Sequence, residues 1–327
     1  MYATSSQKKD WTFTSEEIAL RRKNANNIFR AKHKELLSKG EEELFLNPED
    51  ELIMQRIVED AATRFADKFR PHIWPSVKWT AYAYFKRLFL DWSASESSPK
   101  IVIMACFYLA MKTDEFYVTI DEFVSNLSTG SPEQNTSRIL GLEPEIMRSL
   151  NYNLTVHAPY RPFEGHLMEM KTRMVLLAFD LETIRNDAFK FFDKALQTDV
   201  MMMFSPSQIS LAAIKYGLVT QGKSPDILKE FLAKLFGVED NAWGSSSEGM
   251  KNVVKLMERI EVIINTVEED FMNINDADRL QLQKRAGALT ELMSELTRRR
   301  SEQWKANGSI GKAPGDVDEQ PVDSDDE

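Results

Sequence analysis

Apolar residues recur along this chain mostly at intervals of three and four positions, which is the period of an amphipathic α-helix. A stripe near the C-terminus steps by four, three, four and three positions. It consists of Leu282, Ala286, Leu289, Met293 and Leu296. A sparser stripe runs through residues 14–36. Further helices are expected at 51–70, 76–91, 133–150, 181–197 and 247–268. Because no segment shows the alternation of a half-buried strand, the pattern predicts an all-α fold.

Helix-start signals recur along the chain, because a capping side chain precedes a proline in five places. These are Asn47-Pro48, Ser98-Pro99, Ser131-Pro132, Ser205-Pro206 and Ser224-Pro225. Proline suits the first turn of a helix, since the N–H that it lacks would have no intrahelical partner there. The signals therefore agree with a fold made of many helices.

Two segments are apolar on nearly every side, and both begin with Ser-Pro. They cover residues 98–111 and 205–218 and start 107 residues apart. A helix that is apolar all round must be surrounded by other helices. We therefore expect two bundles of similar plan, each built around one central helix. Two prolines interrupt the helical pattern at residues 157–162, which predicts the joint between the bundles.

This organisation divides the chain into five parts. We expect an N-terminal segment with one helix at 1–46, the first bundle at 47–156, the second bundle at 157–270, a C-terminal helix at 271–308 and an acidic tail at 309–327. Seven acids and no base lie between residues 313 and 327. Such a run cannot bury enough apolar surface to fold, so the tail is expected to be disordered.

The charge distribution argues against direct contact with nucleic acid or a membrane. The net charge is −10, and most of it lies in the acidic tail. The rest of the chain is nearly balanced and lacks the basic surface that non-specific DNA binding requires. The apolar run at 101–111 is far shorter than the roughly 20 residues of a membrane-spanning helix. The N-terminus lacks the apolar core of a signal peptide.

No cofactor, metal or catalytic site is recognisable in the sequence. The histidines are His33, His72, His157 and His166, and no two of them have the spacing of a helical zinc site. The single cysteine, Cys106, excludes a disulfide framework and suits a reducing compartment. A glycine-rich phosphate loop and a G-x-S-x-G motif are also absent. We therefore expect a protein that acts by binding another protein rather than by catalysis.

The end of the first apolar segment carries the pattern Leu-Ala-Met-Lys-Thr-Asp-Glu at residues 109–115. A lysine in the last turn of a helix can simply complement the negative end of the helix dipole, so the pattern alone leaves the role of Lys112 open. The pattern resembles the signature that ends the third helix of the cyclin box. Residues 142–154 resemble the fifth helix of the cyclin box and its exit. The chain therefore resembles the cyclin family from residue 1 to about residue 270, and the resemblance is weaker after that.

The resemblance to cyclins implies a binding site for a cyclin-dependent kinase. In that family a lysine and a glutamate grip the kinase, and the match gives these roles to Lys112 and Glu143. It also implies that Met147, Tyr152 and Leu154 form an apolar pocket beside them. The implied fold is two tandem five-helix cyclin-box repeats, with an N-terminal and a C-terminal helix packed on them.

Further stretches resemble one branch of the cyclin family, in the same order along the chain. They are residues 11–17, 84–87, 157–165, 171–173 and 205–208. That branch supplies the non-catalytic regulatory subunit of the kinase that activates other cyclin-dependent kinases. The implied partners are the catalytic kinase subunit, a RING-finger assembly subunit and the transcription factor TFIIH, in which the kinase phosphorylates the tail of RNA polymerase II. The implied location is the nucleus.

The alternative function is that of a cyclin-fold transcription adaptor that binds nucleic acid. Such an adaptor requires a basic face, and the acidity of the chain argues against one.

Overall fold

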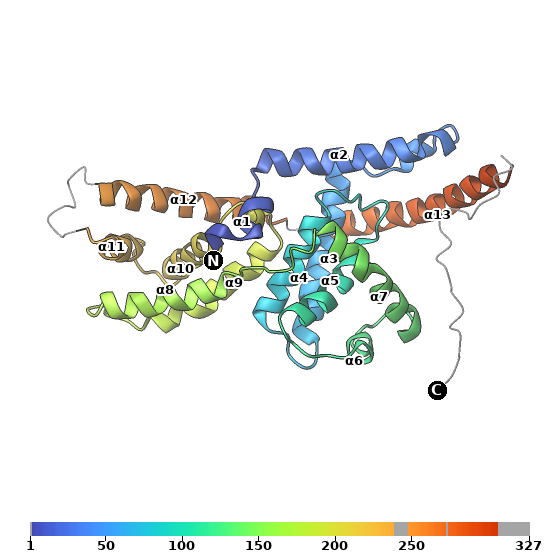
Figure 1. The fold of residues 1–327 in the computed structure, drawn as a ribbon. Coiled ribbons are helices and arrows are strands. Elements are labelled where there is room, and N and C mark those ends of the chain that lie inside the picture. The colour runs from blue at the N-terminus through green and yellow to red at the C-terminus, as the bar shows by residue number, and fades with distance from the viewer. Residues whose placement is uncertain (1, 239–247, 273, 307–327) are drawn as a thin grey trace.

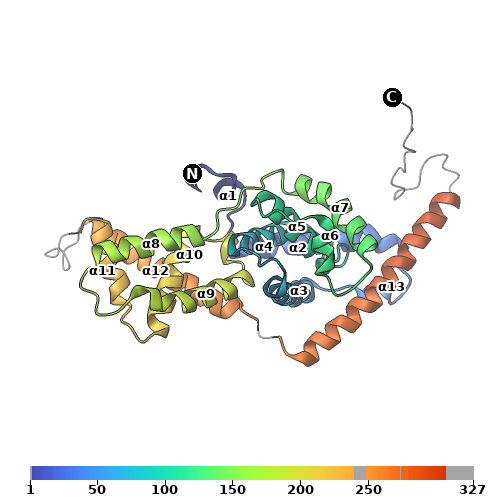
Figure 2. The same ribbon diagram turned by 90° about the horizontal axis from the view of Figure 1, so that it is seen from below.

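The architecture comes from a computed structural model, which describes residues 2–238, 248–272 and 274–306. Every regular element in these ranges is a helix, so the predicted all-α fold is confirmed. Two helical bundles lie side by side, and two long helices, α2 (Ser15–His33) and α13 (Asp276–Ala306), flank the first bundle (Figures 1 and 2). The predicted acidic tail at 309–327 lies outside the described residues.

The first bundle is built around α5, the apolar segment that the sequence placed at its centre. Its helices are α3 (Pro48–Lys68), α4 (Pro75–Leu88), α5 (Pro99–Thr113), α6 (Ile120–Ser125) and α7 (Pro132–Ser149). Helices α3, α4 and α7 pack around α5. The side chains of Val102, Cys106 and Leu109 on α5 are almost fully excluded from solvent. A reciprocal capping box between Thr119 and Glu122 starts the short helix α6.

The second bundle repeats this plan around α10. Its helices are α8 (Tyr160–Arg173), α9 (Arg185–Leu196), α10 (Pro206–Thr220), α11 (Asp226–Leu235) and α12 (Glu248–Asp270). Helices α8, α9 and α12 pack around α10. Gly217 lets α10 approach the backbone just before α9 closely, because a Cβ atom at this position would lie 2.9 Å from the carbonyl oxygen of Ile184. The prediction of two five-helix repeats, each with a buried central helix, is thus confirmed.

Short helical turns occupy several connections. They are η1 (Tyr2–Thr4), α1 (Ser6–Asp10), η2 (Lys34–Leu36), η3 (Glu41–Leu44), η4 (Leu181–Ile184) and η5 (Val200–Met202). The connection between the bundles covers residues 150–159, so it begins before the predicted stretch 157–162 and ends within it, where α8 begins at Tyr160. Pro162 lies in the first turn of α8, where the N–H that it lacks would have no intrahelical partner.

Helices α2 and α13 meet on the first bundle in a small apolar core of their own. It consists of Phe29, Phe45, Leu46, Ile57, Leu282, Leu289, Leu292 and Leu296. Leu289 and Leu296 on α13 are 3% and 0% exposed, so the predicted stripe of this helix faces inward. On α2, the predicted stripe residues Ile18, Ala25 and Phe29 are also buried. Both terminal helices therefore pack as amphipathic helices, as their sequence patterns predicted.

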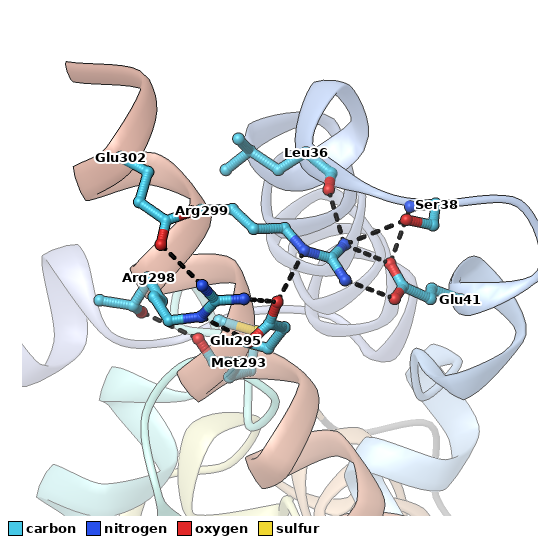
Figure 3. Close-up of polar contacts among 9 residues, drawn as sticks. Leu36, Ser38, Glu41, Met293, Glu295, Arg298, Arg299 and Glu302 are labelled. Atoms are coloured by element: carbon cyan, nitrogen blue, oxygen red, sulfur yellow. Dashed lines mark hydrogen bonds and ion pairs between the residues drawn. The ribbon is translucent and has the colours of Figure 1, made fainter. Parts of the chain in front are cut away.

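A polar contact adds to this core, as Figure 3 shows. The guanidinium of Arg299 on α13 donates two hydrogen bonds to Glu41, with Nη1–Oε2 and Nη2–Oε1 distances of 2.7 and 2.9 Å. Nη1 also donates to the carbonyl oxygen of Leu36 and to the hydroxyl of Ser38, while Nε donates to Glu295 within α13. The bonds from Arg299 lower the pKa of the Glu41 carboxyl to about 2. The segment after α2 is thereby tied to the last turns of α13.

A buried cluster of ionised side chains joins the two bundles and α2. Asp199, just before η5, accepts hydrogen bonds from Arg22 of α2 at 2.6 and 2.9 Å and lies 3.0 Å from Arg56 of α3. Arg56 also pairs with Glu59 at 2.8 Å, and Lys86 of α4 reaches Glu59 at 2.5 Å. Glu59 and Lys86 are each 1% exposed. Three cations and two carboxylates, from α2, α3, α4 and the residue before η5, thus share one site.

The ionisation states in this cluster depend on one another. Burial alone would raise the pKa of Asp199, but the charges of Arg22 and Arg56 outweigh burial and hold this pKa well below its usual range. Burial, together with repulsion from Arg56, lowers the pKa of Lys86 to about 8. A buried ion pair contributes little net stability, whereas removal of one partner leaves an uncompensated buried charge.

The substitution Asp199→Asn tests this cluster. It leaves Arg22 and Arg56 without their carboxylate, and we expect it to lower the free energy of unfolding by about 3–5 kcal/mol. The matched control is Asp91→Asn, because Asp91 is 59% exposed and pairs with the neighbouring arginine, Arg21. The control should stay within about 1 kcal/mol of the parent chain. Urea unfolding followed by circular dichroism measures both, and equal effects would show that the cluster does not anchor the bundles.

The substitution Leu289→Asp tests the packing of α13. It places a carboxylate in the small apolar core, and we expect it to reduce the stability of that core by at least about 3 kcal/mol. Leu280→Asp is the control, since Leu280 lies on the same helix and is 53% exposed. Thermal unfolding and amide hydrogen exchange of α13 are the measurements. Unchanged exchange in the Leu289 variant would contradict the packing described above.

Candidate functional site

Lys112 and Glu143 are 31 residues apart in sequence and form an ion pair on the surface of the first bundle. Lys112 lies in the last turn of α5 and Glu143 in the middle of α7, and these two helices pack against each other. The Lys112 side chain is 42% exposed and that of Glu143 is 14% exposed. The structure therefore brings together the two charged residues that the resemblance singled out, and a partner can reach them.

An aromatic ring orients the lysine of this pair. The Nζ atom of Lys112 lies 4.9 Å from the centre of the Tyr108 ring, which is one turn earlier on α5 and within cation–π distance. Burial and the negative charge of Glu143 raise the pKa of the Tyr108 hydroxyl. Lys112 is held by both the ring and the carboxylate, so it loses less conformational freedom when a partner binds.

The backbone ends α5 at Thr113, one residue after Lys112. The N–H of Asp114 donates to the carbonyl oxygen of Ala110, and the N–H of Phe116 donates to that of Met111 at 2.8 Å. Between them, Glu115 adopts a left-handed conformation with φ of 58°. This is the hydrogen-bond pattern of a Schellman-type helix end, which satisfies the last carbonyl groups. It fixes where α5 stops and thus where Lys112 stands.

The turn after α7 presents Tyr152 to solvent. Asn151 and Tyr152 have φ values of 50° and 56°, and the Tyr152 N–H donates to the carbonyl oxygen of Met147 at 2.9 Å. A left-handed conformation is unfavourable for a tyrosine, so surrounding contacts must enforce it. Leu150, the residue before the turn, is fully buried, while Tyr152 is 66% exposed. The turn therefore directs a large amphipathic side chain outward beside α7.

Two side chains of α4 hold the chain that follows this turn. The Tyr84 hydroxyl donates to the carbonyl oxygen of Leu154, and Nη1 of Arg87 donates to that of Asn153 at 3.3 Å. The Arg87 guanidinium also lies 5.2 Å from the centre of the Trp11 ring, and burial lowers the pKa of Arg87 to about 10. The sequence marked Tyr84 and Arg87 only as part of a family resemblance, and their positioning role emerges from these contacts.

The predicted apolar side chains lie near this turn in different environments. Met147 and Leu154 are partly buried against the main core, whereas Tyr152 is exposed. Grooves of about 570 and 850 Å³ exist elsewhere on the molecule, and none of these three residues lines either one. Their use as a pocket for a kinase stays a prediction.

Within the described residues, no three or more His, Cys, Asp or Glu side chains are grouped closely enough to hold a metal ion. No helix in this part of the chain combines the length and apolar character needed to cross a bilayer.

Comparison with solved structures identifies the same fold in chains of two protein complexes. A chain of the CAK complex of Chaetomium thermophilum bound to ATP-γ-S superposes with a TM-score of 0.72, covers 97% of this chain and 98% of that chain, and is 21% identical. A chain of the yeast TFIIK (Kin28/Ccl1/Tfb3) complex superposes with a TM-score of 0.58, covers 81% and 100%, and is 22% identical. At these identities the likeness concerns the fold.

Comparison with protein families and curated sequences identifies the relatives of the chain. The model of the cyclin N-terminal domain matches residues 50–155, and the model of the cyclin C-terminal domain matches residues 158–268. Cyclin-H of Xenopus laevis is 36% identical over 272 residues, which are 82% of this chain and 81% of that protein. Cyclin mcs2 of Schizosaccharomyces pombe is 30% identical over 227 residues, covering 65% and 68%. The two domain matches and the extent of identity with cyclin-H show that the chain belongs to the cyclin family, within its cyclin-H group.

Proposed function

We propose that this cyclin binds and activates a cyclin-dependent kinase as its regulatory subunit. The kinase complex is the CDK-activating kinase, which as part of TFIIH also phosphorylates the C-terminal repeats of RNA polymerase II. The observation that carries the proposal is the accessible Lys112–Glu143 pair on two packed helices of a cyclin-H-like chain. The fold shared with chains of a CAK complex and a TFIIK complex supports it.

The geometry of the charged pair suits a protein partner. The Lys112 ammonium has three N–H donors, and its ion pair with Glu143 uses one carboxylate oxygen, Oε1. Further donors on Lys112 and the second oxygen of Glu143 can therefore bond to backbone or side-chain groups of the kinase. Because both residues stand on packed helices rather than on a loop, the pair is positioned before the kinase arrives.

The apolar part of the surface supplies contact area beside this pair. Tyr152 is exposed and held in position by its left-handed turn, and exposed aromatic side chains of this kind often dominate binding energy. Met147 and Leu154 lie beside it and remain partly accessible. We propose that the three side chains form the apolar contact next to Lys112 and Glu143, as the family resemblance implies.

We also propose the partners of this cyclin, its location and the limits of its domains. The subunit works with a RING-finger assembly protein and within TFIIH in the nucleus, and it contributes no catalytic residue, cofactor or metal of its own. We place the first cyclin box at 47–156 and the second at 157–270. The segments 1–46 and 271–308 supply the flanking helices, and 309–327 form the acidic tail.

The alternative function, that of a nucleic-acid adaptor, requires a surface of unpaired basic side chains. The stretches richest in arginine do not provide one. The described residues contain two runs of three consecutive Arg or Lys residues, 21–23 on α2 and 298–300 on α13. In the first run, Arg21 pairs with Asp91 and Arg22 with Asp199. Arg298 is paired with Glu295 and Glu302, and Arg299 is bound to Glu41, so both are committed to internal contacts (Figure 3). The observations therefore favour a protein partner.

Substitution of the charged pair tests the proposed grip. We expect Lys112→Ala and Glu143→Ala each to weaken binding of the kinase subunit at least about tenfold, because truncation leaves a partner charge unpaired at an interface. The thermal stability of the free cyclin should change little, since a partly exposed pair contributes only about 0–1 kcal/mol. Titration of each purified variant against the kinase, with activity on a polymerase-tail peptide, provides the measurement.

The matched control for this experiment is another surface pair. Lys171 and Glu182 pair at 2.6 Å with side chains 48% and 39% exposed, on the second bundle. Their alanine variants should bind the kinase like the parent chain. If both the Lys112 and Glu143 variants bind the kinase with the affinity of the parent chain, the proposed grip is wrong. Lys112 would then only complement the negative end of the α5 dipole.

A further inference from the structure

The proposed kinase grip has two parts, and different elements carry them. Lys112 stands in the last turn of α5, whereas Tyr152 stands on the turn that follows α7. A kinase that contacts both parts at once requires a fixed spacing between them, because contacts displaced by about 1 Å are no longer made well. A group that fixes this spacing therefore contributes to kinase binding even if it does not touch the kinase.

One buried side chain of α4 contacts both parts. The hydroxyl of Tyr84 lies 3.1 Å from the hydroxyl of Thr113, the residue directly after Lys112. It also donates to the carbonyl oxygen of Leu154. Tyr84 is fully buried, whereas Thr113 and Leu154 are half-buried. The phenol thus bridges the last turn of α5 and the segment that leaves the Tyr152 turn.

The Tyr84 hydroxyl acts as a permanent donor in this bridge. Burial raises the pKa of this phenol, so its proton stays bound at any physiological pH. The Thr113 hydroxyl lies 3.1 Å from the carbonyl oxygen of Ala110 as well, so its single proton is within reach of both neighbours. A continuous chain of polar contacts therefore runs from the backbone of α5, through two hydroxyl groups, to the backbone of Leu154.

The exit of the Tyr152 turn is held by few bonds. The N–H of Leu154 donates to the carbonyl oxygen of Tyr152 at 3.0 Å. Arg87, which follows Tyr84 by one turn on α4, donates to the neighbouring carbonyl oxygen, that of Asn153. Loss of the phenol's bond would therefore leave the segment attached at Asn153 but free to shift at Leu154, away from the end of α5.

We propose that the Tyr84 hydroxyl is a positioning group of the kinase grip, which sets the spacing between Lys112 and Tyr152. The inference rests on the proposed function, because it concerns the affinity of the chain for the kinase. The ring of Tyr84 belongs to the main apolar core, and a phenylalanine ring would fill the same space. A purely structural role of the hydroxyl predicts a loss of stability alone, whereas a positioning role predicts a loss of kinase affinity as well.

Tyr82 provides a matched control on the same helix. It is also fully buried, and its hydroxyl makes the same two kinds of contact, with the carbonyl oxygen of Glu59 and with the hydroxyl of Thr63. Both of these partners lie on α3, away from the proposed grip. Comparison of Tyr84→Phe with Tyr82→Phe therefore separates the location of the lost hydroxyl from its chemistry.

The test titrates the purified kinase subunit with each full-length variant by calorimetry. We expect Tyr84→Phe to weaken binding at least about fivefold, because the unsatisfied Leu154 carbonyl lets the turn leave its binding position. Tyr82→Phe should bind the kinase like the parent chain. Both variants should melt at a lower temperature, since each leaves a buried carbonyl without its donor. Amide hydrogen exchange at residues 152–156 should become faster in Tyr84→Phe and stay unchanged in Tyr82→Phe.

A double-mutant cycle tests whether the hydroxyl acts through the turn. In the background of Tyr152→Ala, the exchange of Tyr84 for phenylalanine should change kinase affinity by less than about twofold, because the side chain that the hydroxyl positions is already gone. The two substitutions should thus be strongly non-additive. Tyr82→Phe should have no effect in either background.

Two results would overturn the inference and leave the proposed function intact. The first is equal kinase affinity in the two phenylalanine variants while Lys112→Ala still weakens binding, which would make Tyr84 a core residue only. The second is a fivefold loss in Tyr84→Phe that persists in full in the Tyr152→Ala background. If Lys112→Ala and Tyr152→Ala both bind the kinase like the parent chain, the proposed grip itself is wrong, and the inference is wrong with it.

Discussion

The burial of α5 is the constraint on which the first bundle depends. Its central residues, such as Cys106 and Phe107, are fully excluded from solvent, so neighbouring helices must cover it along its length. A helix covered in this way reaches the surface only at its two ends. Lys112 stands at one of these ends, beside Glu143. The place of the charged pair therefore follows from the requirement to bury one apolar helix.

The buried ion cluster sets how the two bundles align. Hydrophobic contact between bundles is tolerant of small rotations, whereas Asp199 must meet both Arg22 and Arg56 at hydrogen-bond distance. Such a cluster contributes little net stability but makes misaligned arrangements unfavourable, since each would leave a charge buried and unpaired. Because Arg22 belongs to α2, the same contact also fixes the N-terminal helix. The contact that aligns the two repeats therefore also positions α2 on them.

The sequence predicted those parts of the structure that obey local rules. Apolar period and capping residues predicted the central helices α5 and α10, and the stripe through Leu289 predicted the packing of α13. No local rule links Lys112 to Glu143 across 31 residues, and only the family resemblance paired them. The contact of Arg22 with Asp199 spans 177 residues and had no sequence signal. The left-handed turn at Tyr152 was also missed, because tyrosine rarely adopts that conformation.

A groove of about 570 Å³ on the first bundle illustrates the same limit. Its lining includes Lys68 of α3 and Arg138 of α7, and in the sequence each of them is an ordinary surface cation. Only the packing of α3 and α7 around α5 brings them to one groove with apolar residues such as Phe65 and Met104. Because these residues come from elements far apart in the sequence, no local pattern predicts that they meet.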